Sequence, residues 1–164
     1  MHPLIYSAVL LIFLSSAEIA LAERRSHCND RLPTTLDKLI KQRYPEWQIG
    51  TGHDRGCKTP ILKVDFYGDG RTVYAMVIEK IYGYGGKVDL KFIVAEKKAP
   101  QWELILVENL GGYIYHEPRK ELVSVYEDKV LRSKGDLIIL WGGESWAIAY
   151  GWTGDKIDRV HLRD

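Results

Sequence analysis

From about residue 60 to the end of the chain, apolar and polar residues alternate in short runs separated by glycine-containing turns. In residues 88–94, every second residue is apolar, which is typical of a strand that buries one face. The Asp69-Gly70 pair predicts a hairpin between residues 60–66 and 71–81. The other clear runs are residues 102–106, 137–141, 145–152 and 157–162, and less regular runs occur at residues 111–116 and 122–126.

A helical spacing precedes these strands, with apolar residues three and four positions apart at Leu36, Leu39 and Ile40. Thr34 is the expected N-cap, with the Asp37 side chain reaching back to it, and the proline after Tyr44 is expected to end the helix. The pattern therefore predicts one α+β domain, in which a single N-terminal helix packs on a mostly antiparallel β-meander of about six to eight strands.

The predicted strand 145–152 is unusual because its two faces differ in size. One side carries Trp146, Ile148, Tyr150 and Trp152, and the other carries Ser145, Ala147, Ala149 and Gly151. Two different neighbours are therefore expected. We expect the bulky face to lie in the core and the small face to lie under the helix; alternatively, the aromatic face contributes to a binding surface.

The first 22 residues have the pattern of a secretory signal. Leu4–Leu14 is an apolar run, and Ala20-Leu21-Ala22 fits the small-x-small site that a signal peptidase cuts. The run is shorter than the about 20 apolar residues that span a membrane. We expect residues 1–22 to be a signal peptide and residues 23–164 to be a single periplasmic or secreted domain with no membrane anchor after cleavage. A buried N-terminal strand or helix is the alternative, since no Lys or Arg precedes the apolar run.

Charge excludes some partners. The leader contains Glu18 and no Lys or Arg, so the 23 basic and 22 acidic residues of the chain leave a net charge of +2 after cleavage. Both signs are interspersed, which argues against nucleic acid or an anionic membrane as the main partner.

The two cysteines, Cys28 and Cys57, are expected to form a disulfide, as is common in exported proteins. Closing this loop would stabilise the fold by about 3–4 kcal/mol. Two alternatives stay open: free thiols, or a metal site that also uses His27 and His53, although no CxxC or HxxxH spacing supports it.

Asp65-Phe66-Tyr67-Gly68-Asp69-Gly70 is the nearest approach to a ligand-binding motif. Calcium loops place oxygen ligands at alternate positions and a glycine at the sixth. Asp65 and Asp69 occupy the first and fifth positions here, but Tyr67 and Val73 occupy the third and ninth. The sequence therefore predicts at most a weak calcium site at Asp65 and Asp69, with a metal-free turn as the alternative.

The same segment resembles a known group of proteins. A helix, Tyr44-Pro45-x-Trp47 and a strand ending in Asp65-Phe66-x-Gly68-Asp69-Gly70 follow one another over residues 34–80. This order is similar to that of small exported bacterial proteins of unknown function, whose turn resembles the calcium-binding turn of FG-GAP and VCBS repeats. The resemblance implies bacterial origin and export more than any activity.

Signatures of catalysis are scarce. The chain has no G-x-S-x-G, no H-E-x-x-H and no phosphate-binding loop. An acid/base pair would have to come from the following carboxylates: Glu103, Glu108, Glu117, Glu121 and Glu144. A small hydrolase with an unrecognised carboxylate site is therefore one alternative function, and a calcium-dependent or structural envelope domain is another.

Aromatic residues in or beside glycine-containing turns are more suggestive. They are Tyr67, Tyr82, Tyr84, Tyr113, Tyr115, Trp141 and Trp146. Tyrosine on glycine-rich loops is typical of binding surfaces, although small β-proteins also use such residues to fill the core. We therefore expect an exported, non-enzymatic domain, without a cofactor, that binds another protein, such as an inhibitor or immunity protein acting in the periplasm.

Overall fold

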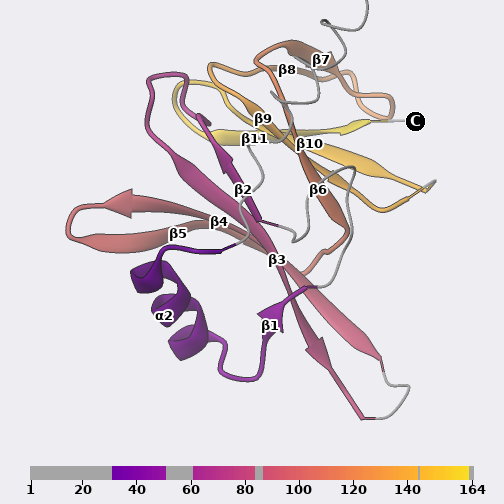
Figure 1. The fold of residues 1–164 in the computed structure, drawn as a ribbon. Helices are drawn as coiled ribbons and strands as arrows, with labels where there is room; N and C mark the ends of the chain where they lie inside the picture. Colours follow the sequence, from indigo (N-terminus) through magenta and orange to yellow (C-terminus); the bar gives the residue numbers. More distant parts are fainter. Residues whose placement is uncertain (1–30, 51–60, 84–86, 144, 163–164) are drawn as a thin grey trace, which may run out of the picture.

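The computed structural model describes residues 31–50, 61–83, 87–143 and 145–162. Within these ranges the chain forms one helix and eleven strands, and every strand pairing is antiparallel (Figure 1). The elements are α2 (Thr34–Arg43), β1 (Gln48–Ile49), β2 (Ile61–Val64), β3 (Val73–Ile81), β4 (Val88–Lys98), β5 (Gln101–Glu108), β6 (Tyr113–Glu117), β7 (Glu121–Val123), β8 (Val130–Arg132), β9 (Leu137–Trp141), β10 (Ala147–Trp152) and β11 (Ile157–Leu162).

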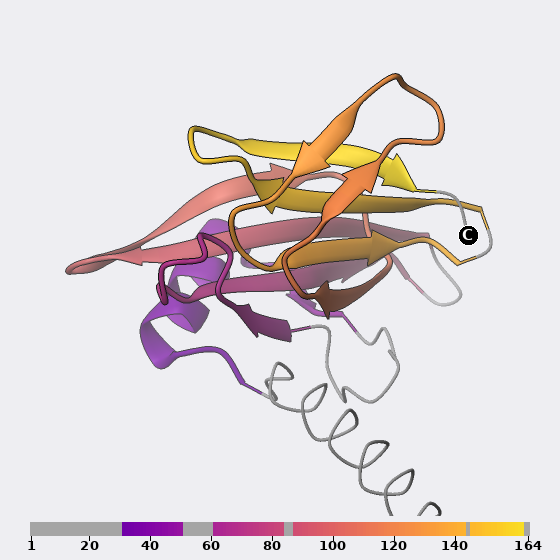
Figure 2. The same cartoon turned by 90° about the horizontal axis from the view of Figure 1, so that it is seen from above.

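The elements are stacked in four layers (Figure 2). α2 covers one face of the first sheet, in which β3 pairs with β4 on one side and with both β1 and β2 on the other, while β5 forms the far edge. The second sheet has the order β11-β10-β9-β6 and packs on the opposite face of the first. The hairpin of β7 and β8 lies over the outer face of the second sheet.

The predicted antiparallel β-structure is confirmed, but the number of strands is eleven, not six to eight, and the strands form two facing sheets and an outer hairpin. Two strands that match no predicted run, β1 and β8, have only two or three residues. A strand that short cannot show a recognisable alternation, so the sequence pattern missed them. The less regular run at residues 122–126 overlaps the three-residue strand β7.

Alternate residues of the first sheet belong to different cores, because successive side chains of a strand point to opposite faces. Met76 packs with Leu36 and Ile40 of α2, whereas Val77 and Phe92 lie in the core between the two sheets. The first sheet is therefore buried on both faces near its centre.

The start of α2 differs from the prediction. Pro33, not Thr34, occupies the N-cap position, and no side chain caps the helix. The Asp37 carboxylate accepts a hydrogen bond from Lys41 (2.7 Å) one turn later instead of reaching back to Thr34. The helix ends as expected, with Tyr44 as the C-cap before the proline.

The two faces of β10 meet two different layers. Ile148 and Tyr150 lie in the core between the sheets, so the prediction for the bulky face is confirmed. Ala147 and Ala149 pack beneath the β7–β8 hairpin, against Leu131. The prediction that the small face lies under the helix is wrong, because α2 covers the far side of the first sheet.

One polar cluster joins β5 to the second sheet. Tyr150 is almost fully buried, and its hydroxyl donates to Oε2 of Glu108 (2.8 Å). A nitrogen of Arg159 donates to both oxygens of the same carboxylate (2.7 and 2.8 Å). Burial, followed by the bond to Glu108, raises the pKa of Tyr150.

Strand β3 runs between two ends of the sandwich. The end at Val73 carries the β2–β3 loop (residues 65–72) and the turns at residues 133–136 and 153–156, and we call it the loop end. The end at Ile81 carries the tip of the β3–β4 hairpin, which projects beyond the other strands in Figure 1, and we call it the hairpin end.

Candidate functional site

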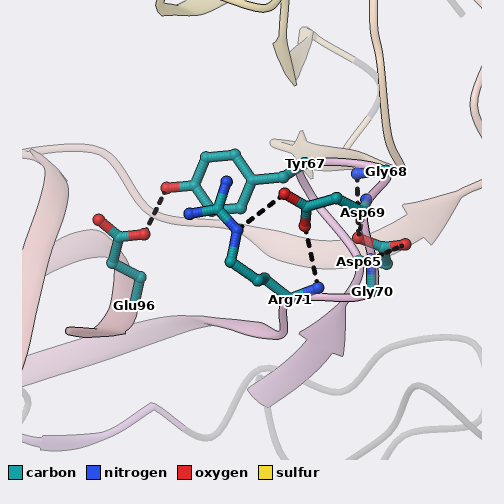
Figure 3. A network of polar contacts seen from close by, with 7 residues as sticks. All are labelled: Asp65, Tyr67, Gly68, Asp69, Gly70, Arg71 and Glu96. Carbon is teal, nitrogen blue, oxygen red and sulfur yellow. Dashed lines mark hydrogen bonds and ion pairs between the residues drawn. The ribbon is translucent and has the colours of Figure 1, made fainter. Parts of the chain in front are cut away.

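At the loop end, the carboxylate of Asp65 organises the β2–β3 loop (Figure 3). Its Oδ1 accepts hydrogen bonds from the backbone N–H groups of Gly68 (2.9 Å) and Asp69 (3.2 Å), and its Oδ2 accepts one from Gly70 (3.0 Å). Gly68 and Gly70 have φ angles of 73° and 84°, a region that favours glycine. The Gly-Asp-Gly sequence therefore wraps the backbone around this carboxylate.

The second acidic residue of the loop, Asp69, is hydrogen-bonded to Arg71. Its carboxylate accepts hydrogen bonds from the backbone N–H (3.0 Å) and the Nε (2.8 Å) of Arg71. The backbone bond is the largest cause that lowers the pKa of Asp69. The guanidinium of Arg71 also lies over the ring of Tyr67, 4.2 Å from its centroid (Figure 3).

Tyr67 connects this loop to β4. Its hydroxyl donates to Oε2 of Glu96 (2.7 Å), and the Lys98 ammonium lies 3.1 Å from the other oxygen of that carboxylate. Glu96 is only 6% exposed, so these partners offset the cost of burying its charge. Burial, followed by the hydrogen bond with Glu96, raises the pKa of Tyr67. The Tyr67 ring meets Trp152 edge-on, with centroids 5.1 Å apart.

The loop is also held against the second sheet. The backbone N–H of Asp136 donates to the carbonyl oxygen of Asp65 (2.9 Å). A Cβ on Gly68 would lie 2.2 Å from the carbonyl oxygen of Lys134, and a Cβ on Gly135 would lie 2.4 Å from that of Asp65. Only glycine permits these approaches, so the loop acts as a tie between the two sheets.

The carboxylate oxygens of the predicted calcium ligands already have hydrogen-bond partners. Asp65 and Asp69 share one loop, but each of their four carboxylate oxygens accepts a hydrogen bond from the loop itself. In the part of the chain that the structure describes, no group of three or more His, Cys, Asp or Glu side chains could hold a metal ion. Calcium would have to compete with Arg71 and the loop N–H groups, and calcium binding stays a prediction.

At the hairpin end, apolar side chains of the inner face of the first sheet reach solvent, beyond the buried carboxylate of Glu79, which accepts a hydrogen bond from Gln48. Val77 and Phe92 are buried between the sheets, and Ile81 and Val88 lie four residues further along the same faces of β3 and β4. They pair across the hairpin, and Ile81 is 54% and Val88 45% exposed. The second sheet therefore does not cover the tip.

Tyr82 follows Ile81 at this tip and is 44% exposed. Its hydroxyl donates to Oδ2 of Asp89 (2.9 Å), and the Lys80 ammonium lies 4.9 Å from its ring centroid. These contacts orient the ring without burying it. We call Ile81, Tyr82 and Val88 the hairpin-tip patch.

Three more of the predicted surface aromatics lie near the hairpin end and are half-buried. The rings of Tyr113 and Trp141 are 5.6 Å apart, and Trp146 packs against the core between the sheets. The Trp146 ring also lies so close to Gly142 that a Cβ there would come within 2.0 Å of it.

The remaining predicted surface aromatics lie elsewhere. Tyr115 packs against the cluster beneath the outer hairpin, and Tyr67 belongs to the loop end. Tyr84 lies outside the described residues. The structure therefore brings Tyr82, Tyr113, Trp141 and Trp146 to one end of the sandwich and separates Tyr67 and Tyr115 from them.

The carboxylates considered for acid/base chemistry make ion pairs. The pairs are Glu103–Lys98 (2.6 Å), Glu108–Arg159 (2.7 Å), Glu117–Lys120 (2.8 Å) and Glu121–Arg132 (2.7 Å). This is the usual environment of acidic side chains on sheets and turns. Glu144 lies outside the described residues.

Other predictions also fall outside the described ranges. They concern the signal peptide (residues 1–22), the Cys28–Cys57 disulfide and the alternative metal site with His27 and His53. No helix in the described ranges is long and apolar enough to cross a membrane.

Sequence reasoning missed Ile81 and Val88 as surface residues, and it missed Arg71 and Glu96 at the loop end. One signal was present: the predicted strand 71–81 is longer than the predicted strands 137–141, 145–152 and 157–162 that could cover it. Glu96 gave no signal, because its partner Tyr67 is distant in sequence.

Comparison with known proteins gives no match: no family model, no curated protein and no solved structure is similar to this chain. The resemblance of the Asp65 turn to FG-GAP and VCBS repeats stays a prediction.

Proposed function

We propose that this chain is an exported, non-enzymatic domain that binds another protein through the hairpin-tip patch. The observation that carries the proposal is the exposure of Ile81, Tyr82 and Val88 on a projecting hairpin. Soluble proteins expose clustered large apolar side chains mainly where they interact with a partner. Tyrosine is also among the residues that contribute most to binding free energy in protein interfaces.

The shape of the hairpin supports a partner with a concave surface. The ends of β3 and β4 extend beyond the other strands (Figure 1), so this part of the hairpin fits a cleft better than a flat face. Long projecting loops bind concave epitopes in the same way in other binding proteins. An inhibitor or immunity protein that blocks the cleft of a secreted enzyme or toxin has this geometry.

Neighbouring side chains would enlarge the contact. Leu90 lies next to the tip on the same face as Val88, and Trp146, at the same end of the sandwich, packs against the core between the sheets. Both are half-buried, so they offer apolar area without loss of the fold when a partner covers them. Binding would thus extend from an exposed centre to a partly buried rim.

A capture experiment with envelope extract tests the proposal. Tagged wild-type protein is compared with the Ile81→Thr/Val88→Thr double variant, which keeps β-branched residues in the hairpin. We expect the wild type to retain a specific partner and the double variant to lose it, with a decrease in affinity of at least tenfold.

The outer hairpin provides a matched control. Val123 and Val130 also form an exposed cross-strand pair, on β7 and β8. The Val123→Thr/Val130→Thr variant should bind the partner as the wild type does. Equal affinity of the wild type and the Ile81→Thr/Val88→Thr variant would contradict the proposal, and loss of binding in the control alone would transfer the site to the outer hairpin.

The immunity-protein interpretation has its own test. An immunity protein is expected to be encoded beside its toxin, and the purified pair should form a complex that abolishes the toxin's activity. A partner that stays fully active in the complex would exclude inhibition while leaving the binding proposal intact.

A further inference from the structure

A pocket of about 420 Å³ opens at the loop end, on the face of the first sheet that carries α2. Tyr74 and Trp102 line it, and their rings meet edge-on with centroids 5.6 Å apart. The indole Nε1 of Trp102 donates to Oγ1 of Thr35 (2.8 Å) in the first turn of α2, which fixes the orientation of the ring. The pocket therefore has a rigid aromatic surface.

Basic side chains border these rings. Lys63 is the cross-strand partner of Tyr74, and Lys97 is the cross-strand partner of Trp102. Both lysines line the pocket, and neither makes an ion pair with any described residue. Arg71 adds a third positive charge. Its guanidinium side chain donates to Asp69 through Nε.

The one acidic residue of the lining is Glu96. Tyr67 donates to one oxygen of this carboxylate, and Lys98, which also pairs with Glu103, lies beside the other. With Asp69 paired to Arg71, the four cations Lys63, Arg71, Lys97 and Lys98 outnumber the three carboxylates Asp69, Glu96 and Glu103, so the pocket keeps a positive potential. Such a potential attracts anions, and the attraction weakens as salt screens it.

We propose that this pocket binds an anionic group carried on a flat apolar ring, with the ring against Tyr74 and Trp102 and the anion between Lys63 and Lys97. The site lies at the opposite end of the sandwich from the hairpin-tip patch, so the proposal does not depend on the proposed protein-binding function. Two sources share this chemistry: a free aromatic carboxylate, and an acidic residue next to an aromatic residue in a protein segment.

An NMR titration of the ¹⁵N-labelled protein tests the site. The probes are 2-naphthoate, the neutral 2-naphthalenemethanol and acetate, and the Trp102→Phe variant assigns the indole signal of Trp102. We expect saturable shifts of that indole signal and of the Lys63 and Lys97 amides with 2-naphthoate. The neutral ring and the anion without a ring should each bind at least about fivefold more weakly.

Charge variants provide the matched control. Lys63→Gln and Lys97→Gln should each weaken 2-naphthoate binding by about twofold to fivefold, the effect of losing one exposed charge pair. Lys134→Gln removes the same charge from an exposed lysine of the loop end that does not line the pocket, and it should leave the affinity unchanged.

A second titration distinguishes a free aromatic carboxylate from an acidic and aromatic protein segment. It uses a blocked peptide containing Asp-Phe, with an Asn-Phe peptide as its neutral counterpart. Tighter binding of the Asp-Phe peptide than of 2-naphthoate would assign the site to a protein segment, and the reverse order would assign it to a small molecule. The proposal is overturned if neither anion shifts the pocket signals, if the neutral probes bind equally well, or if Lys63→Gln and Lys97→Gln have no effect.

Discussion

The loop end and the hairpin end of the sandwich differ in which side chains find partners within the chain. At the loop end, polar groups find partners within the chain: three backbone N–H groups converge on Asp65, and the Tyr67 hydroxyl reaches Glu96. At the hairpin end, Ile81 and Val88 expose large apolar side chains to water.

If the hairpin-tip patch binds a partner as proposed, this difference separates stability from recognition. The loop end holds the two sheets together through close backbone contacts, so changes there should be costly. The exposed side chains of the hairpin-tip patch contribute little to the core, so they can change with little loss of stability. We therefore expect equivalent substitutions at the two ends to have very different effects.

The largest contrast is expected between two glycines of similar conformation. Gly68 (φ 73°) would place a Cβ 2.2 Å from a backbone oxygen, whereas Gly83 (φ 66°) has open space around it. Gly68→Ala should lower the free energy of unfolding by about 3 kcal/mol or more, because strain and a backbone clash add. Gly83→Ala should lower it by only about 1 kcal/mol, from conformation alone. Urea unfolding measures both, and equal losses would break the comparison.

A smaller contrast is expected between two aspartates. Asp65→Asn replaces a carboxylate that accepts three backbone N–H groups, and it should lower the free energy of unfolding by about 2 kcal/mol. Asp89→Asn, at the hairpin end, affects the bond from Tyr82 and a distant lysine, so about 0.5 kcal/mol or less is expected. Urea unfolding of the two variants under identical conditions checks this order, and a larger loss for Asp89→Asn would contradict it.

The loop end should also respond to alkaline pH. The raised pKa of Tyr67 means that the folded protein holds this proton more tightly than the unfolded chain does. Stability is therefore intact below the ordinary tyrosine pKa of about 10 and falls as the pH rises above it. Tyr150 acts in the same direction, so Tyr67→Phe should reduce this fall without abolishing it. Urea midpoints measured from about pH 9 to pH 11 test the effect, and an unchanged slope would contradict it.

The tip substitutions should have almost no effect on the fold. Ile81→Thr and Val88→Thr should change the free energy of unfolding by about 0.5 kcal/mol or less, as is usual for exposed positions. The same change at Val77, buried four residues earlier on the same face, should cost more than about 1 kcal/mol. Thermal unfolding compares the variants, and a large loss at the tip would show that it supports the core.

Calcium should have the smallest effect of all. Because Arg71 and the loop N–H groups already occupy the Asp65 and Asp69 carboxylates, millimolar calcium is expected to leave the melting temperature unchanged. A clear increase in the melting temperature that Asp65→Asn abolishes would restore the calcium-dependent alternative.

Periodicity was sufficient where a residue's role depends on its neighbours in sequence. It predicted the apolar face of α2 and the bulky buried face of β10, and the Asp69-Gly70 pair likewise predicted the β2–β3 hairpin. These features follow from the spacing of side chains along one element.

Periodicity was insufficient where the role depends on a distant segment. Val77 and Ile81 look alike in sequence, and only the extent of the second sheet makes one buried and the other exposed. The Tyr67–Glu96 bond joins the β2–β3 loop to β4, and no local spacing indicates it. A carboxylate in a Gly-Asp-Gly turn suits either a cation or backbone N–H groups, and the folded loop shows the second arrangement here.

The backbone bond from Asp136 to Asp65 has a consequence for the timing of folding. It joins two halves of the chain, and contacts between distant segments form only after a large loop has closed. Interactions that form late act mainly on the rate of unfolding. The contacts at the loop end would then slow unfolding and lengthen the lifetime of the folded chain.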